Sequence, residues 1–278
     1  MKVFCILSDQ RAHRSRSPAM FTAVLQRCGI KGAYVPFVVA PGQLGQAVQS
    51  LRVLNMAGAN ITVPYKERVI PYLDILSEGA NIIGAVNTIV INGEQLKGYN
   101  TNAIGFMDAM AGAGFDAEGK SALVFGTGGA ARAVVFILNW LRTDKIFVAG
   151  RNDQKSGVMV DRLGGEALTM AALANASIKV DLVVNATSVS DPDESPTLAR
   201  LTQNLTLPQC ELLIDLNYGR VHNFWQTLAQ HQDIPFMDGL DSLAFQARRT
   251  FALWTGAQVP PGDFIDALNM PPEATAAA

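Results

Sequence analysis

A glycine-rich loop between a strand-like segment and a helical segment is the feature that most constrains the fold of this chain. The apolar run Ser121 to Phe125 leads directly into Gly126-Thr127-Gly128-Gly129-Ala130, and a helical apolar pattern from Ala133 to Leu141 follows. In the first βα turn of a dinucleotide-binding unit, such glycines allow a tight turn and let the backbone approach the pyrophosphate. A second strand-like run, Lys145 to Ala149, completes a βαβ pattern. The loop therefore predicts a dinucleotide held at a helix N-terminus.

The residues after the second strand bear on which dinucleotide binds. Arg151 stands where a guanidinium can pair with a ribose 2′-phosphate, and Lys155 adds a second positive charge. These residues favour NADP over NAD. Asp153 argues the other way, because a carboxylate there can accept from a free 2′-hydroxyl and repel a phosphate. A third interpretation is that all three are solvated loop charges.

Composition limits the classes of protein to which the chain can belong. With 278 residues, 49% of them hydrophobic and 17% charged, the chain can form one large or two ordinary domains. A net charge of -2 gives no basic footprint for nucleic acid. The three scattered cysteines form no disulfide or zinc pattern, no His/Asp cluster offers a metal site, and the N-terminal apolar run is too short for a signal peptide. We expect a cytoplasmic protein with no metal, nucleic-acid or membrane partner.

Short apolar strands alternate with amphipathic helices in two blocks, which predicts an α/β protein with mostly parallel sheets. The first block precedes the glycine loop, and the second runs from about Ala103 to Asp238. In the first block we expect strands at 3–7, 33–39 and 58–62, helices at 17–28, 41–54 and 65–74, and a hairpin of 85–91 with 95–99. In the second we expect strands at Leu123, Ile146, Leu182 and Leu212, then a long helix at 242–255 and a short one after Pro260-Pro261.

Seven short motifs resemble, in order, those of the shikimate dehydrogenases, and the resemblance runs almost end to end. They are Ala12-His13-Arg14-Ser15-Arg16-Ser17-Pro18, Gly58-Ala59-Asn60-Ile61-Thr62-Val63-Pro64-Tyr65-Lys66, Gly84-Ala85-Val86-Asn87-Thr88, Gly98-Tyr99-Asn100-Thr101-Asn102, Asn185-Ala186-Thr187-Ser188, Asp215-Leu216-Asn217-Tyr218, and Asp238-Gly239-Leu240 with Gln246. Each motif alone is a weak signal. Seven in the family's order around a dinucleotide loop are a strong one.

The resemblance implies two lobes. Residues 1–102 plus 239–270 would form an α/β substrate-binding domain, residues 103–238 a Rossmann-type NADP-binding domain, and residues 271–278 a disordered tail. The implied activity is the NADP-dependent reversible reduction of 3-dehydroshikimate to shikimate in aromatic amino acid biosynthesis. The partner is then a small cyclic hydroxy-acid, and the oligomeric state, monomer or homodimer, stays open.

The chemistry of a reversible alcohol oxidation indicates which residues act. Such a reaction needs a proton acceptor at the hydroxyl, and Lys66 is the best candidate, since desolvation in a closed site lowers the pKa of a lysine. The alternative is a surface lysine on the helix expected to open at Tyr65. Ser15 and Ser17 can both donate to a substrate carboxylate at the helix that Pro18 starts. The alternative for Ser17 is a helix N-cap.

The family's fold assigns the other site residues. The resemblance implies that Asn87 and Asn102 hold the ring hydroxyls beside Lys66, and that Thr62, Tyr218 and Gln246 line the rest of the substrate site. It places the cofactor on Gly126, Thr127, Gly128, Gly129, Ala130, Arg151, Asn152, Lys155, Thr187, Leu216 and Gly239.

Departures from the family's motifs leave the substrate open. Asn102 stands where the motif has an aspartate, and a neutral amide can orient a ligand but cannot take its proton. Phe21-Thr22, Ser188-Val189-Ser190 and Asp241-Ser242 also depart from the usual residues, and we interpret these changes as lying on the substrate and nicotinamide sides. Three hypotheses follow: an NADP-dependent shikimate dehydrogenase, an NAD- or dual-cofactor quinate enzyme, and a catalytically impaired ligand-binding protein.

Overall fold

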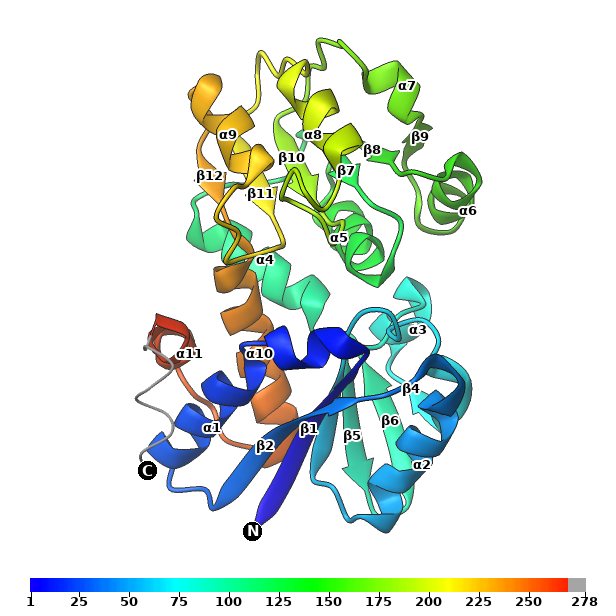
Figure 1. The fold of residues 1–278 in the computed structure, drawn as a ribbon, viewed down its shortest axis with the longest axis vertical. Helices are drawn as coiled ribbons and strands as arrows, with labels where there is room; N and C mark the ends of the chain where they lie inside the picture. The colour runs from blue at the N-terminus through cyan, green and yellow to red at the C-terminus, as the bar shows by residue number, and fades with distance from the viewer. Residues whose placement is uncertain (270–278) are drawn as a thin grey trace. The chain divides into compact units, whose positions relative to one another are not determined.

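The computed structural model describes residues 1–269 and shows an α/β fold with two sheets (Figure 1). The chain divides into two compact units, residues 1–105 with the segment from Leu243 onward, and residues 106–242. Both borders fall inside helices, α4 (Asn102–Gly112) and α10 (Gly239–Thr255). We expected the borders at 102/103 and 238/239, a few residues earlier in each case. The tail expected at 271–278 lies outside the described residues.

The sheet of the first unit is mixed. Its strands stand in the order β2-β1-β3-β5-β6-β4, and β5 runs antiparallel to both of its neighbours. The strand bounds are β1 Lys2–Ser8, β2 Gly32–Val38, β3 Gly58–Ile61, β4 Ile75–Leu76, β5 Thr88–Asn92 and β6 Gln95–Tyr99. The helices are η1 Gln10–Arg14, α1 Ser17–Arg27, η2 Pro41–Gln43, α2 Leu44–Val53, η3 Ile70–Tyr72, α3 Glu78–Ile83 and α11 Pro261–Asn269, with part of α10. Apart from β5, every paired strand in this sheet has a parallel neighbour.

Both faces of this sheet are covered, which is why its inner strand β1 is apolar at Val3–Leu7. Cys5 and Leu7 of β1 pack in one cluster with Val48 and Leu51 of α2. On the other face Phe4 stacks on Trp254 of α10, with ring centroids 4.9 Å apart. Alternate side chains of one strand thus point to opposite faces, as strand geometry requires.

The prediction of a helix at 65–74 is wrong. This segment forms turns and the short 3-10 helix η3. The carbonyl of Lys66 accepts from the N–H of Val86, at 2.7 Å, and so does not serve an α-helical ladder. Pro71 has no N–H to donate, and the β-branched Val69 and Ile70 before it are poor helix formers. Lys66 consequently lies on a turn fixed by a distant segment.

The sheet of the second unit is entirely parallel. Its order, β12-β11-β10-β7-β8-β9, is the 3-2-1-4-5-6 order of dinucleotide-binding folds when β7 is counted as the first strand. The strands are β7 Ser121–Phe125, β8 Lys145–Ala149, β9 Glu166–Leu168, β10 Leu182–Asn185, β11 Leu212–Asp215 and β12 Phe236–Met237. The helices between them are α5 Gly129–Trp140, α6 Asp153–Leu163, α7 Met170–Leu173, α8 Pro196–Gln203 and α9 Phe224–His231. The strand order reverses between β7 and β10, where such folds bind their ligands.

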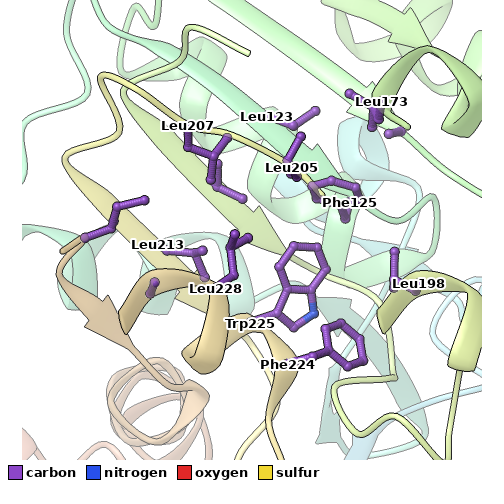
Figure 2. Close-up of a cluster of buried hydrophobic side chains, with 14 of the residues drawn as sticks. Leu123, Phe125, Leu173, Leu198, Leu205, Leu207, Leu213, Phe224, Trp225 and Leu228 are labelled. Carbon is purple, nitrogen blue, oxygen red and sulfur yellow. The ribbon is translucent and has the colours of Figure 1, made fainter. Parts of the chain in front are cut away.

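A hydrophobic cluster fills the space between this sheet and the helices α8 and α9 (Figure 2). Trp225 is fully buried at its centre, with its ring centroid 4.7 Å from that of Phe125. Leu123, Leu213 and Leu228 surround it. The strands that lead into the glycine loop and into the other loops at their carboxyl ends are therefore held by a well-packed core. Within residues 1–269, no helix is both long and apolar enough to cross a membrane.

Candidate active site

Asn87 is the centre of a buried hydrogen-bonded group in the first unit. The backbone N–H of Thr101 donates to Asn87 Oδ1 over 2.8 Å, and this bond fixes which end of the Asn87 amide is which, because an N–H cannot accept. Asn87 Nδ2 then faces three acceptors, Thr101 Oγ1 at 2.8 Å, Asn102 Oδ1 at 2.7 Å and Gln246 Oε1 at 2.8 Å. Three of the residues predicted for the substrate site, Asn87, Asn102 and Gln246, are thus brought together.

The same group continues into the core through residues that the sequence analysis did not assign to the site. Asn60 donates to the carbonyl of Asn87 at 2.9 Å and accepts from the hydroxyl of Tyr34 at 2.8 Å. Thr250 lies 2.9 Å from the hydroxyl of Thr88 and 3.0 Å from that of Thr101. Asn60, Thr88 and Thr101 stand inside the recognised motifs, which was a signal for them. Tyr34 and Thr250 stand outside them and gave none.

Lys66 is partly buried, so the surface-lysine interpretation is wrong in both of its parts: it is neither on a helix nor fully solvated. Burial lowers the pKa of its amine to about 8, since desolvation disfavours the charged form. Within residues 1–269 it forms no ion pair that would raise the pKa again. Through its carbonyl and Val86, its backbone lies next to the segment that carries Asn87.

Ser15 and Ser17 lie at the junction between η1 and α1, and Thr62 directly follows β3. Ser15 Oγ accepts from the N–H of Ser17 at 3.2 Å. Ser17 is the first residue of α1 and the cap position is Arg16, so the interpretation of Ser17 as an N-cap is wrong. Thr62 is partly buried and donates its N–H to Leu7 over 3.2 Å.

Phe21 is a core residue, which corrects its interpretation as a change on the substrate side. It is 1% exposed and stacks on Tyr34 with ring centroids 4.8 Å apart. It also contacts Trp254 of α10 and Phe264 of α11. Phe21 therefore lies on the buried side of α1, where the aromatic contacts account for a large apolar side chain.

The glycine loop fits a dinucleotide pyrophosphate. Gly126 has φ +120°, and a Cβ there would stand 2.9 Å from the carbonyl oxygen of Ala186 in the loop after β10, so the fold itself requires a glycine. Gly128, the N-cap of α5, has an ordinary φ of -86° and is exposed, and a Cβ there would meet no atom within 4 Å. Nothing in the described chain explains a glycine at Gly128. Open space beside free helix N–H groups suits an approaching phosphate.

Gly129 and Ala130 are the first residues of α5, and the loop after β8 lies next to the glycine loop. Gly150 approaches Thr127 so closely that a Cβ there would stand 2.7 Å from Thr127 Cγ2. Asn152 caps α6 by accepting from the N–H of Lys155 at 2.9 Å. Asp153 stands in the first turn of α6, where the helix dipole favours a carboxylate. Arg151 is exposed, and no hydrogen bond or ion pair holds it within the described chain.

The remaining cofactor candidates lie at the carboxyl ends of β10, β11 and β12. Thr187 donates to Asn185 Oδ1 at 2.7 Å, and Asn217 Nδ2 donates to the carbonyl of Thr187 at 3.0 Å. Gly239 approaches Leu216 closely, since a Cβ there would stand 2.3 Å from the carbonyl oxygen of Leu216. Thr187, Leu216 and Gly239 are therefore brought together.

The buried carboxylate of Asp215, which the sequence analysis did not assign to the site, holds these loops together. It accepts from Asn185 Nδ2 at 2.8 Å and from Asn223 Nδ2 at 2.7 Å, and burial raises its pKa. Ser190 is also buried, and its hydroxyl accepts from Asn217 at 2.9 Å. Ser190 thus helps to hold the loop after β10 against the loop after β11.

Tyr218 comes directly after Asn217 in the second unit. It lines a pocket with Arg220, Asn223, Phe236 and Asp238. Tyr218 is partly buried. Within residues 1–269, no three His, Cys, Asp or Glu side chains gather in a way that could hold a metal ion.

The order of the second sheet and the fit of its glycine loop define a class: a two-unit α/β protein with a Rossmann-type dinucleotide-binding unit. Two family models match the chain, the shikimate dehydrogenase substrate binding domain over residues 8–89 and shikimate / quinate 5-dehydrogenase over residues 109–231. The chain belongs to the shikimate dehydrogenase family. The resemblance inferred from the seven motifs is thereby confirmed.

Curated and solved relatives agree with this membership. A shikimate dehydrogenase (NADP(+)) of Desulforamulus reducens is 39% identical over 92% of this chain and 91% of its own. That of Moorella thermoacetica is 37% identical over 88% and 85%. The shikimate 5-dehydrogenase of Thermus thermophilus, solved with NADP(H) and shikimate, is 32% identical, covers 96% of this chain and 98% of its own, and superposes with a TM-score of 0.84.

Proposed function

We propose that this chain catalyses the NADP-dependent, reversible reduction of 3-dehydroshikimate to shikimate. The observation that carries the proposal is the group formed by Asn87, Asn102 and Gln246 next to the segment of Lys66. The same chain has a glycine loop of the kind that binds dinucleotides. In that loop no packing constraint of the described chain accounts for the glycine at Gly128, because a Cβ there would meet no atom within 4 Å. The curated relatives carry the same activity in their names.

In the proposed mechanism Lys66 handles the proton at the reacting oxygen. NADP, when bound, supplies the hydride acceptor for oxidation, and its reduced form supplies the donor for reduction. In oxidation neutral Lys66 takes the hydroxyl proton, and in reduction the ammonium returns it to the carbonyl oxygen. A pKa of about 8 makes both forms available near neutral pH.

The substrate is then held by neutral polar groups and two serines. Ser15 and Ser17 bind the carboxylate, with help from the N-terminus of α1. Asn102 and Gln246 face the ring oxygens, Asn87 holds both of their amides in place, and Thr62 completes the set within the same unit. The residues before the first border, 1–105, with the segment from Leu243 onward, form the substrate-binding domain, as the proposal requires.

The cofactor is held at the carboxyl ends of the second sheet. Gly126, Thr127, Gly128, Gly129 and Ala130 receive the pyrophosphate, and Thr187, Leu216 and Gly239 lie on the nicotinamide side. Arg151, Asn152 and Lys155 face the 2′-phosphate, which favours NADP. Asp153 has a role at the start of α6 that does not involve a ribose.

A cytoplasmic location belongs to the same proposal. It is supported by the three cysteines, which are all free, a pattern that suits a reducing compartment. We further propose that the chain acts on its small-molecule substrate as a monomer or a homodimer.

The test is an absorbance assay of nicotinamide reduction with four pairs of reactants, shikimate or quinate with NADP or NAD. The proposal predicts the largest kcat/KM for shikimate with NADP. A larger value for quinate or for NAD would instead make the chain a quinate-type or NAD-type enzyme. Turnover only in Asn102→Asp would mean that the chain binds its ligands but lacks a carboxylate. No turnover by either the wild type or Asn102→Asp in any of the four assays would contradict the proposal.

A further inference from the structure

We infer that Asn102 makes the substrate site selective for a carbonyl over a hydroxyl, so that the site binds the 3-oxo acid more tightly than the 3-hydroxy acid. The inference rests on the proposed function, with the reacting oxygen, whose proton Lys66 handles, set beside Asn102 as the family resemblance implies. What it adds is the direction of the hydrogen bonds that the ligand must complete.

The first step is the orientation of Asn87. Thr101 N–H donates to Asn87 Oδ1, and the hydroxyl of Thr88 lies 3.3 Å from the same oxygen. The opposite orientation would set the Thr101 N–H against an NH2 group, donor against donor. Asn87 is only 3% exposed, so water cannot relieve such a clash. Asn87 therefore presents its NH2 group to Asn102.

The second step is the orientation of Asn102. An NH2 group 2.7 Å away demands an acceptor, so Asn102 turns its oxygen toward Asn87. The backbone N–H of Asn102 donates to Asn100 Oδ1 at 3.1 Å, which helps to hold the start of α4. The other end of the Asn102 side chain, Nδ2, has no hydrogen-bond partner in the described chain and is not sealed from solvent. A donor is therefore what Asn102 offers to a ligand.

Gln246 repeats this arrangement. Its Oε1 accepts from Asn87 Nδ2 at 2.8 Å and from the hydroxyl of Thr101 at 3.2 Å. Its Nε2 is left, like Asn102 Nδ2, as a donor without a partner in the described chain. One central amide thus aligns two further amides, and both present N–H groups.

A ligand oxygen in front of these donors has to accept. A carbonyl oxygen has two lone pairs and no proton, so it satisfies an amide N–H and an ammonium together. A hydroxyl also carries a proton, which needs an acceptor of its own, and a polar group left unpaired in a partly buried site weakens binding. We expect about a tenfold preference for the oxo acid, the effect of one such unmatched group.

The test compares dissociation constants by isothermal titration calorimetry at neutral pH. Nucleotide-free protein is titrated with 3-dehydroshikimate and with shikimate, so that no reaction can occur. Asn102→Asp keeps the shape of the side chain but replaces the N–H donor with an oxygen. Asn92→Asp makes the same chemical change at an exposed site and is the matched control.

We expect the wild type and Asn92→Asp to bind 3-dehydroshikimate about tenfold more tightly, and Asn102→Asp to lose or reverse that preference. Equal affinities of the wild type for the two acids would overturn the inference and leave the proposed function intact. An unchanged ratio in Asn102→Asp would do the same. If no protein binds either acid, the proposed function fails, and the inference fails with it.

Discussion

Lys66 is a residue whose chemistry depends on its surroundings more than on its type. Burial lowers the pKa of its amine to about 8, and within the described chain no carboxylate pairs with it to oppose that shift. The sequence identified the residue through its motif. It could not predict the turn that holds it, because that turn depends on the distant N–H of Val86.

The pH dependence of turnover should follow the proton of Lys66. For shikimate oxidation, kcat/KM should rise with pH and level off above the lowered pKa of Lys66, about 8, because only the neutral amine accepts a proton. For reduction it should fall above that pH, because the ammonium is needed. Rate profiles in both directions measure this. Profiles without a bend in that region, or the same bend in Lys66→Ala, would reject the role of Lys66.

The orientation of side-chain amides in a polar site cannot be predicted from sequence. Asn87, Asn102 and Gln246 could be predicted from their motifs. The direction of their amides could not, because it is set by a single backbone donor, the N–H of Thr101. Phe21 was misinterpreted for a related reason: a changed residue next to a motif can belong to the core behind it.

At the scale of elements, the loop between β7 and α5 contains two glycines with different reasons to be there. Gly126→Ala should lower the free energy of unfolding by about 1 kcal/mol or more, because φ +120° strains an L residue. Gly128→Ala should leave stability nearly unchanged and weaken NADPH binding about tenfold or more, because a methyl group would occupy open space beside the helix N-terminus. Thermal unfolding and fluorescence titration with NADPH measure both. Wild-type affinity in Gly128→Ala would count against the predicted cofactor position.

Helices α4 and α10 meet at Gly105, where a Cβ would stand 2.6 Å from Cβ of Gln246. Gly105→Ala should force the two helices apart, lower the free energy of unfolding by about 1–3 kcal/mol and weaken binding of the acid, since Gln246 would leave Asn87. Gly79→Ala, in α3 with open space around it, is the control and should be neutral or slightly stabilising. Chemical denaturation and calorimetry measure the effects. Equal behaviour of the two variants would disprove this packing argument.

Element types were predictable where hydrophobic periodicity and turn residues agreed. The hairpin of β5 and β6 and four strands of the second sheet, β7, β8, β10 and β11, follow the expected runs, whereas the short edge strands β9 and β12 were not expected. The segment 65–74 did not follow its pattern, because a tertiary hydrogen bond from Val86 and the missing N–H of Pro71 outweighed it.

At the scale of the whole molecule, each unit has a core of its own, and that of the second unit supports the glycine loop. Trp225→Ala should lower the free energy of unfolding by about 3–5 kcal/mol, because a fully buried large side chain would leave a cavity. Circular dichroism during denaturation measures the loss. An unchanged unfolding transition would mean that the cluster around Trp225 does not support the fold.

The length of the chain left one large or two ordinary domains open, and the family resemblance implied two. Alternating elements indicated α/β structure, but periodicity alone could not show that the first sheet is mixed and the second parallel, because strand partners lie far apart in the sequence. The family resemblance implied a Rossmann-type domain, but the 3-2-1-4-5-6 strand order is a finding of the structure.

The central claim is that a hydrogen of shikimate passes to NADP while Lys66 takes the hydroxyl proton. The most direct measurement uses shikimate with deuterium on the carbon that carries the reacting hydroxyl, followed by mass spectrometry of the nucleotide. The account predicts one deuterium in the reduced nucleotide with the wild type, and about 10² to 10⁴ times slower labelling with Lys66→Ala, whose fold and NADPH binding should persist. Unlabelled nucleotide from folded wild-type protein, or labelling at the wild-type rate in Lys66→Ala, would contradict it.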